Sequence, residues 1–248
     1  MNLRSRLFNV YWTLRRLLAP TLKYSQSWYE DALKRYVTPS VEWVEIGCGH
    51  SILPSWRINE ERQLVKTCKA VFGIDYDLPS LKAHRNINKK LRGDVTKLPF
   101  RSEAFDLVTA NMVVEHLDNP NEQFKEISRI LRPKGVFLFH TPNAHGYGVI
   151  LSKIVPESLK GKLIYLLEGR EEHDVFPTHY KANTESQVKA LAQANGFEIL
   201  QLDLNATDAI FAMIPPLAAL ELLWIRLLMT QPFRRLRTNM IVALRKLP

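Results

Sequence analysis

A short apolar stretch that ends in an acid and two glycines constrains the fold of this chain more than any other feature. Residues 41–51 read Val-Glu-Trp-Val-Glu-Ile-Gly-Cys-Gly-His-Ser, a pattern typical of a buried strand followed by a turn. Gly47 and Gly49 lack a Cβ atom, so they can adopt positive φ and let a ligand approach the main chain. A helix expected after this turn would point free N–H groups at the same place. A lone Gly-x-Gly also fits an ordinary turn, so the choice between a ligand-binding turn and an ordinary one depends on the rest of the sequence.

Three successive predicted strands end in an acidic residue. These residues are Glu45, Asp75 and Asp94. A single acid at a strand end could cap the next helix, but three in register favour a ligand site, because open parallel sheets bind ligands at the carboxyl ends of their strands. A carboxylate at Asp75 can accept hydrogen bonds from both hydroxyl groups of a ribose.

Helical patterns alternate with the strands along the chain. Strands are predicted at 41–46, 70–75, 91–95, 105–110, 136–139, 197–204 and 239–244, and helices at 1–18, 24–36, 52–69, 119–131 and 184–195. This order predicts a doubly wound, Rossmann-like α/β fold with seven mostly parallel strands and helices on both faces. We expect an N-terminal helical extension over 1–40 and a main domain over 41–248. Within that domain, 144–180 forms a lid or substrate insert after the fifth strand, and 209–237 is an apolar and basic insert before the last strand.

The net charge of +9 is concentrated at the two ends of the chain. Residues 1–35 and 209–248 each carry a net charge of +5, and the residues between them carry about −1. Residues 1–20 have the pattern of an amphipathic helix that lies on a membrane surface, although the same pattern fits a helix docked on its own domain. The paired prolines and two charges of 209–229 argue against a transmembrane helix, and the basic run 234–237 suits anionic headgroups better than nucleic acid.

Two cysteines without metal-binding spacing indicate a reduced, cytoplasmic protein with no disulfide and no bound metal. Arginines interrupt the apolar runs at the N-terminus, so we expect neither a signal peptide nor a membrane span there. The predicted location is the cytoplasm, with peripheral contact at the inner face of a membrane.

The successive motifs together resemble those of class I S-adenosylmethionine-dependent methyltransferases, and most closely the small-molecule enzymes of ubiquinone and menaquinone biosynthesis. The matching motifs are Glu-Ile-Gly-Cys-Gly at 45–49, Gly-Ile-Asp at 73–75, Gly-Asp-Val at 93–95, Phe-Asp-Leu-Val at 105–108 with Glu-His-Leu at 115–117, and Ile-Leu-Arg-Pro-Lys-Gly at 130–135. The resemblance covers residues 41–143 and extends to the helix-strand unit at 183–197. Ser51 stands where the family often has a third glycine, and Ile52 departs from the dinucleotide-binding pattern.

The resemblance implies S-adenosylmethionine as the cofactor and assigns it a set of binding residues. Gly47, Cys48 and Gly49 would border its methionine part, with Glu45 orienting the loop or the amino group. Asp75 would hold the ribose, Tyr76 the adenine face, and Asp94 with Val95 the adenine edge. Asn111 and Met112 would lie where the sulfonium meets the acceptor, and Cys48 is otherwise a small spacer.

Transfer of a sulfonium methyl group needs mainly positioning and exclusion of water, because that methyl group is already activated. If the acceptor must lose a proton, candidate bases are His116, His140, His173 and His179, with His116, His173 and His179 taken as the predicted catalytic residues. The expected acceptor is a small or lipid-like molecule. The alternatives are a nicotinamide-dependent oxidoreductase, which Ile52 and Asp94 disfavour, and a non-catalytic cofactor-binding interaction protein.

Overall fold

The computed structural model describes residues 3–155 and 177–248. The strands are β1 Glu42–Ile46, β2 Ala70–Asp75, β3 Lys89–Arg92, β4 Phe105–Asn111, β5 Leu131–Pro142, β6 Phe197–Asn205 and β7 Asn239–Lys246. The α-helices are α1 Leu3–Leu18, α2 Ser25–Lys34, α3 Ile58–Thr67, α4 Leu78–Ala83, α5 Pro120–Ile130, α6 Tyr147–Ile154, α8 Glu185–Ala194 and α9 Pro215–Leu228. Short 3-10 helices lie at η1 Ser55–Arg57, η2 Val114–His116 and η4 Arg234–Leu236.

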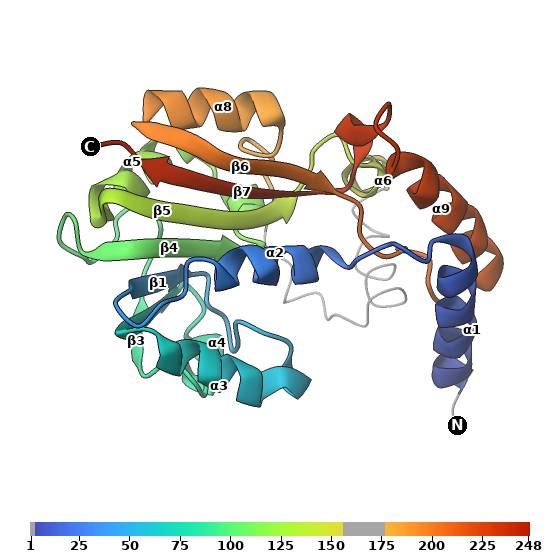
Figure 1. The fold of residues 1–248 in the computed structure, drawn as a ribbon, viewed down its shortest axis with the longest axis horizontal. Helices are drawn as coiled ribbons and strands as arrows, with labels where there is room; N and C mark the ends of the chain where they lie inside the picture. Colours follow the sequence, from blue (N-terminus) through green and yellow to red (C-terminus); the bar gives the residue numbers. More distant parts are fainter. Residues whose placement is uncertain (1–2, 156–176) are drawn as a thin grey trace. The chain divides into compact units, whose positions relative to one another are not determined.

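The strands form one seven-stranded sheet in the order β3-β2-β1-β4-β5-β7-β6 (Figure 1). The pairs β1–β2, β1–β4, β2–β3 and β4–β5 are parallel. Ile46 at the end of β1 pairs with Ile74 on one side and with Ala110 on the other. The carboxyl ends of β1, β2 and β4 therefore lie at one edge of the sheet, which confirms the predicted fold class.

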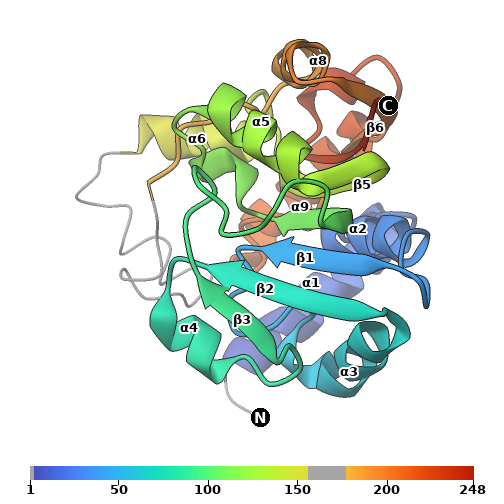
Figure 2. The same ribbon diagram turned by 90° about the vertical axis from the view of Figure 1, so that its left-hand side faces the viewer.

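Helices cover both faces of the sheet, as Figures 1 and 2 show. On one face Leu33 of α2 and the half-buried Leu64 of α3 belong to a cluster with Trp43 of β1. On the other face the Phe124 ring of α5 lies 5.5 Å from the Phe137 ring of β5 in an edge-on contact. Successive strand residues point to opposite faces, so a doubly covered sheet requires apolar side chains at consecutive positions.

One predicted helix begins later in the structure, and two further helices were not predicted. The helix predicted at 52–69 begins only at Ile58, because Pro54 and the turn η1 come first. Helices α4 and α6 were not predicted; α4 begins with the side chain of Asp77 accepting from the N–H of Ser80 at 2.9 Å. The sequence also predicts an amphipathic helix at 159–167, within the insert after the fifth strand, and this segment lies outside the described residues.

Two segments that contain proline lie in elements whose bounds differ from the prediction. The stretch 132–135 is predicted to end the preceding helix, and α5 does end at Ile130, but strand β5 begins at Leu131 and contains this stretch instead of beginning at 136. Pro215 and Pro216 were interpreted as a break, yet they occupy the first positions of α9. Proline fits there because the first helical N–H groups have no partner within the helix. Among the helices of the described chain, none is long and apolar enough to cross a membrane.

The chain divides into two compact units. One comprises 29–141, 178–203 and 241–248, and it contains nearly all of the sheet together with α3, α4, α5 and α8. The other comprises 1–28, 142–177 and 204–240. In this second unit α1 and α9 share a core that includes Tyr11, Ala218, Leu222 and Ile225.

Candidate functional site

The glycine turn after β1 takes the left-handed backbone conformation that its sequence predicts. Gly47 has φ +67° and Gly49 has φ +52°. The N–H groups of Gly47 and Cys48 both donate to the carbonyl of Ile74, at 2.8 and 3.2 Å. A Cβ at Gly47 would lie 2.3 Å from Cγ2 of Val113, whereas a Cβ at Gly49 would meet nothing within 4 Å in the described chain. The turn is thus fixed to β2 and leaves bare backbone and open space beside Gly49.

Cys48 is a buried spacer between the two glycines. A Cβ at Gly73 would lie 2.8 Å from Sγ of Cys48, so the thiol packs where β2 has no side chain. Burial raises the pKa of Cys48 to about 12. The thiol is therefore protonated near neutral pH and is a poor nucleophile.

Asp75 at the end of β2 joins the turn to the next helix. Its Oδ2 accepts the N–H of Gly49 at 2.7 Å, and its Oδ1 accepts the N–H of Asp77 at 2.8 Å. A carboxylate oxygen has two lone pairs, so each oxygen keeps one for a further hydrogen bond. The structure therefore presents Asp75 with two acceptor positions next to the open side of Gly49.

Glu45 points into the sheet. Only 1 % of its surface is exposed, and its carboxyl accepts from the hydroxyl of Thr109, its neighbour in register on β4. Burial raises the pKa of Glu45 to about 8, against a hydrogen bond from Thr109 that lowers it. Glu45 is therefore mostly neutral at pH 7. The role that the resemblance implies for Glu45, orienting the loop or the amino group of the cofactor, stays a prediction.

Tyr76, Asp94 and Val95 follow the ends of β2 and β3. The ring of Tyr76 is 65 % exposed and lies 5.4 Å from the guanidinium of Arg92. Asp94 is exposed and accepts the N–H of Thr96 at 2.8 Å. The N–H of Gly93 donates to the carbonyl of Asp75 at 3.1 Å, so the Asp94 loop is attached to the Asp75 turn. The structure thus brings the predicted ribose and adenine residues together.

Asn111 and Met112 lie at the end of β4, where the backbone is strained. Met112 has φ +57° and a side chain that is 41 % exposed. Its N–H donates to the carbonyl of His140 at 2.8 Å, and Nδ1 of His140 lies 2.9 Å from Oδ1 of Asn111. Positive φ is uncommon for residues other than glycine, and such strained positions are enriched at functional sites.

His140 is a buried structural residue, not an accessible base. Its ring stacks on Tyr29 with 5.8 Å between the ring centres. Burial lowers the pKa of His140 to about 4, so the imidazole is neutral at pH 7. This environment argues against the catalytic role that the sequence left open for it.

Two of the predicted catalytic histidines are brought together by Glu115. His116 follows it in η2, with Nε2 4.0 Å from Oε1 of Glu115. The N–H of His179 donates to the carbonyl of Glu115 at 2.7 Å, and the side chain of His179 is exposed. The buried carboxyl of Glu115 accepts from the hydroxyl of Thr141 at 2.9 Å, which fixes this corner of the domain. His173 lies outside the described residues.

The sequence did not reveal Glu61, which holds the segment after the glycine turn. It is fully buried, and its Oε2 accepts the N–H groups of Ile52 and Leu53 at 2.8 and 2.9 Å. Its Oε1 accepts from the amide of Asn86 at 2.8 Å. An acid within the first turn of a helix was visible in the sequence, but nothing in the pattern indicated that it turns back to the preceding loop.

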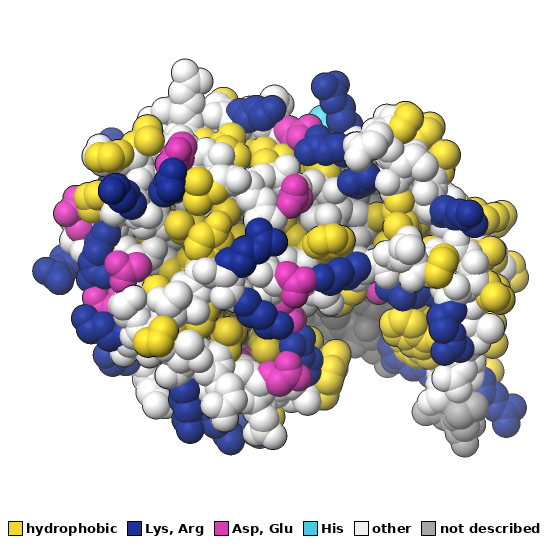
Figure 3. Space-filling model, in the orientation of Figure 1, with side chains coloured by type: hydrophobic (Ala, Val, Ile, Leu, Met, Phe, Trp, Pro, Cys, Tyr) yellow, Lys and Arg dark blue, Asp and Glu magenta, His cyan; other side chains and the backbone are white. Residues whose placement is uncertain are grey.

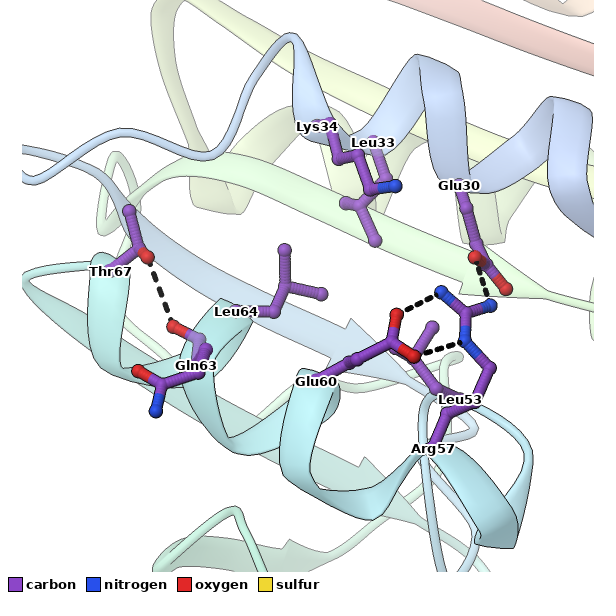
Figure 4. A pocket seen from close by; sticks show the side chains of 9 residues that line it. All are labelled: Glu30, Leu33, Lys34, Leu53, Arg57, Glu60, Gln63, Leu64 and Thr67. Carbon is purple, nitrogen blue, oxygen red and sulfur yellow. Dashed lines mark hydrogen bonds and ion pairs between the residues drawn. The ribbon is translucent and has the colours of Figure 1, made fainter.

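A groove of about 220 Å³ lies between α2 and α3 (Figure 4). Its walls include Leu33, Leu53 and Leu64. The guanidinium of Arg57 donates to both Glu30 and Glu60 across one end. None of the predicted cofactor residues lines this groove, and Arg57 pairs with both of its acids.

Comparison with known proteins identifies the domain that carries these residues. Residues 44–139 match the family model of the methyltransferase domain. The chain contains a class I S-adenosylmethionine-dependent methyltransferase domain.

Individual relatives share this domain with the chain. A malonyl-[acyl-carrier protein] O-methyltransferase of Coxiella burnetii is 32 % identical over 71 residues, covering 29 % of this chain and 24 % of its own length. A ubiquinone biosynthesis O-methyltransferase of Colwellia psychrerythraea is 26 % identical over 141 residues, covering 54 % of this chain and 53 % of its own length. The chain thus aligns with about half or less of these relatives. A solved S-adenosylmethionine-dependent methyltransferase from Mesorhizobium loti shares the fold, with a TM-score of 0.53, 17 % identity, and coverage of 87 % of this chain and 96 % of that one.

The residues of the methyltransferase domain fit S-adenosylmethionine, the cofactor of this family. The space beside Gly49 admits a ligand against bare backbone, and Asp75 keeps an acceptor position on each oxygen. Tyr76 offers an exposed aromatic face next to Asp75, where an adenine ring could stack. Asp94 adds an exposed acceptor on the adjoining loop. These four residues would hold the methionine, ribose and adenine parts, while the cofactor supplies the activated methyl group.

Proposed function

We propose that this protein transfers the methyl group of S-adenosylmethionine to a small or lipid-like acceptor. The hydrogen bond between the N–H of Gly49 and Oδ2 of Asp75 carries this proposal, because it joins the bare turn to the predicted ribose acceptor. Catalysis then consists mainly of holding donor and acceptor in line and excluding water. Asn111 and Met112, at the neighbouring strand end, are the proposed boundary between cofactor and acceptor.

The two relatives act, by their names, on an acyl-carrier-linked malonyl group and in ubiquinone biosynthesis, so they do not agree on one acceptor. Both names specify methylation of oxygen, and we propose an oxygen acceptor here as well. A hydroxyl acceptor loses its proton on methylation, and a base is then useful. His116 and His179 are the proposed candidates, since both adjoin Glu115.

We also propose that the protein works in the cytoplasm, in contact with the inner face of a membrane through residues 1–20 and 209–237. The exposed apolar side chains of α1 and α9 support this location. A lipid-like acceptor would be reached from that position without leaving the bilayer surface.

Transfer from radiolabelled S-adenosylmethionine tests the reaction. The full chain is incubated with the organic and the aqueous fraction of a cell extract, and label is counted in each. We expect label in the organic fraction, its loss in Asp75→Asn and its retention in Asp106→Asn. Asp106 is the matched control because its carboxylate also accepts a backbone N–H, that of Glu42, but next to the start of β4. Absence of label in both fractions would contradict methyl transfer, and label in the aqueous fraction alone would contradict a lipid-like acceptor.

A further inference from the structure

Helix α9 has two apolar faces, and the described part of the chain buries only one of them. Its inner face is buried in a core shared with Tyr11 of α1. Its outer face carries Leu220, Leu223, Trp224 and Leu227, which are 65, 49, 38 and 40 % exposed. These four recur at helical spacing on the side opposite Ala218 and Ile225. A contiguous exposed apolar face of this kind marks an interaction site.

The one acid of α9 turns away from this outer face. Glu221 is buried and accepts from the hydroxyl of Tyr147 and from the N–H groups of Ile210 and Phe211, both at 2.8 Å. Burial and the neighbouring Glu221 raise the pKa of Tyr147. In the sequence Glu221 counted against a transmembrane helix, and in the fold its burial leaves the outer face of α9 without negative charge.

Asp208 is half-buried and paired. It accepts from the hydroxyl of Tyr11 at 3.0 Å and forms an ion pair with Arg15 of α1. Glu221 and Asp208 are the only acids within residues 3–28, 142–155 and 204–240. The exposed charged side chains within these three ranges are therefore all positive. They include Arg4, Arg6, Arg16, Arg226 and Arg235. Figure 3 shows hydrophobic and basic side chains together over α1 and α9.

Arg237 does not belong to this exposed positive surface. Its guanidinium donates to the carbonyls of Leu204, Leu228 and Met229 at 3.0, 3.0 and 2.7 Å. It therefore holds the end of α9 to the end of β6. Of the basic run at 234–237, Arg235 is exposed, and Arg226 of α9 is exposed as well.

We infer that the outer face of α9, with the exposed arginines around it, docks on an anionic lipid bilayer. Leucines enter the acyl boundary, tryptophan prefers the interface, and arginines attract anionic headgroups. A second copy of this surface is a poorer occupant, because like charges would face one another. The inference deepens the proposed membrane contact and does not depend on the methyl-transfer step.

Cosedimentation of the full chain with vesicles tests the docking surface. We expect binding to vesicles that contain phosphatidylglycerol, at least tenfold weaker binding to pure phosphatidylcholine, and weakening as salt is raised. The double variant Leu220→Ser/Leu227→Ser should bind at least tenfold more weakly. Its matched control is Ile199→Ser/Leu200→Ser, which removes two exposed apolar side chains from β6. Unchanged binding of the α9 variant would overturn the inference.

A second pair of variants tests the charges. Arg226→Glu/Arg235→Glu should weaken binding to phosphatidylglycerol vesicles at least tenfold, whereas Arg62→Glu/Lys66→Glu on α3 makes the same change of charge and should leave it unaltered. Equal loss in both pairs would show that net charge alone attracts the vesicle, which overturns a specific surface. Light scattering can reveal a dimer that the variant Leu220→Ser/Leu227→Ser converts to a monomer. If the unmodified chain formed such a dimer and did not bind vesicles, the occupant of the outer face would be a second copy of the chain, and the inference would be overturned.

Binding of S-adenosylhomocysteine, measured on the same preparations, separates this inference from the proposed reaction. We expect all four double variants to bind it as the unmodified chain does, since none of the changed residues belongs to the predicted cofactor site. Retained cofactor binding with lost vesicle binding supports the docking surface. Retained vesicle binding in a chain that binds no cofactor would contradict the proposed function and leave the docking surface standing.

Discussion

The N–H of Gly49 donates to Oδ2 of Asp75 at 2.7 Å, which joins the turn after β1 to the end of β2. In Asp75→Asn the NH2 group replaces one of the two carboxylate oxygens, which face the N–H groups of Gly49 and Asp77. In either rotamer the NH2 group therefore meets a backbone N–H, and two donors face one another. Hydrogen bonds to a charged group contribute about 1.5–3 kcal/mol, so S-adenosylhomocysteine should bind roughly 10- to 100-fold more weakly. Calorimetric titration measures this, with Asp106→Asn as control; equal affinities of the two variants would contradict the role of Asp75.

Gly47→Ala should destabilise the domain more than Gly196→Ala. Both residues have positive φ, +67° and +72°, so both alanines carry a strain of roughly 1–2 kcal/mol. Only at Gly47 does the new Cβ meet another group, Cγ2 of Val113 at 2.3 Å, and overpacking adds about 1–3 kcal/mol. Urea unfolding of the two variants gives the difference directly. Equal losses of unfolding free energy would show that the turn is not packed against Val113.

Glu45 should make the domain less stable as pH rises. Its pKa is about 8 in the folded chain because of burial, above its value near 4.5 in the unfolded chain. The folded state therefore binds the proton more tightly, and stability declines from about pH 4.5 to pH 8, by roughly 3 kcal/mol at pH 7. Glu45→Gln removes this slope and should raise the unfolding free energy at pH 8.

The variant Glu42→Gln should have the opposite effect on the pH dependence of the unfolding free energy. A hydrogen bond from Arg132 lowers the pKa of Glu42, so its contribution is present at neutral pH and is lost as pH falls. Urea unfolding at several pH values distinguishes the two residues. If the unfolding free energy of Glu45→Gln changed with pH in parallel with that of the unmodified chain, Glu45 would not be buried in its neutral form.

Glu61→Ala should lower the unfolding free energy by about 2–4 kcal/mol, because the buried N–H groups of Ile52 and Leu53 lose their acceptor. Glu61→Gln should cost less, since its carbonyl can still accept from both. Faster hydrogen exchange at Ile52 and Leu53 in the alanine variant is the second expected result. If these amides remained as protected as before, the carboxylate would not be what holds this segment.

Local patterns predicted those parts of the site in which neighbours in sequence are neighbours in space. The turn at Gly47 and Gly49 and the acids Asp75 and Asp94 follow their own strands, and parallel pairing places them at one edge. The role of Glu61 was not predicted, because its carboxylate accepts from backbone N–H groups nine and eight residues earlier in the chain. No periodic sequence pattern indicates a contact at that spacing. The burial of Glu45 and Glu221 could not be foreseen either, since Thr109 and Tyr147 are their partners only after folding.

Calorimetric titration with S-adenosylhomocysteine tests the central claim most directly when it compares Gly49→Ala with Gly196→Ala. Both glycines have positive φ and nothing within 4 Å of an added Cβ in the described chain, so the two variants should have equal stability. We predict that the unmodified chain and Gly196→Ala bind S-adenosylhomocysteine and not NADH, and that Gly49→Ala binds at least tenfold more weakly. Undiminished affinity in Gly49→Ala, or binding of NADH instead, would contradict a cofactor site at this turn.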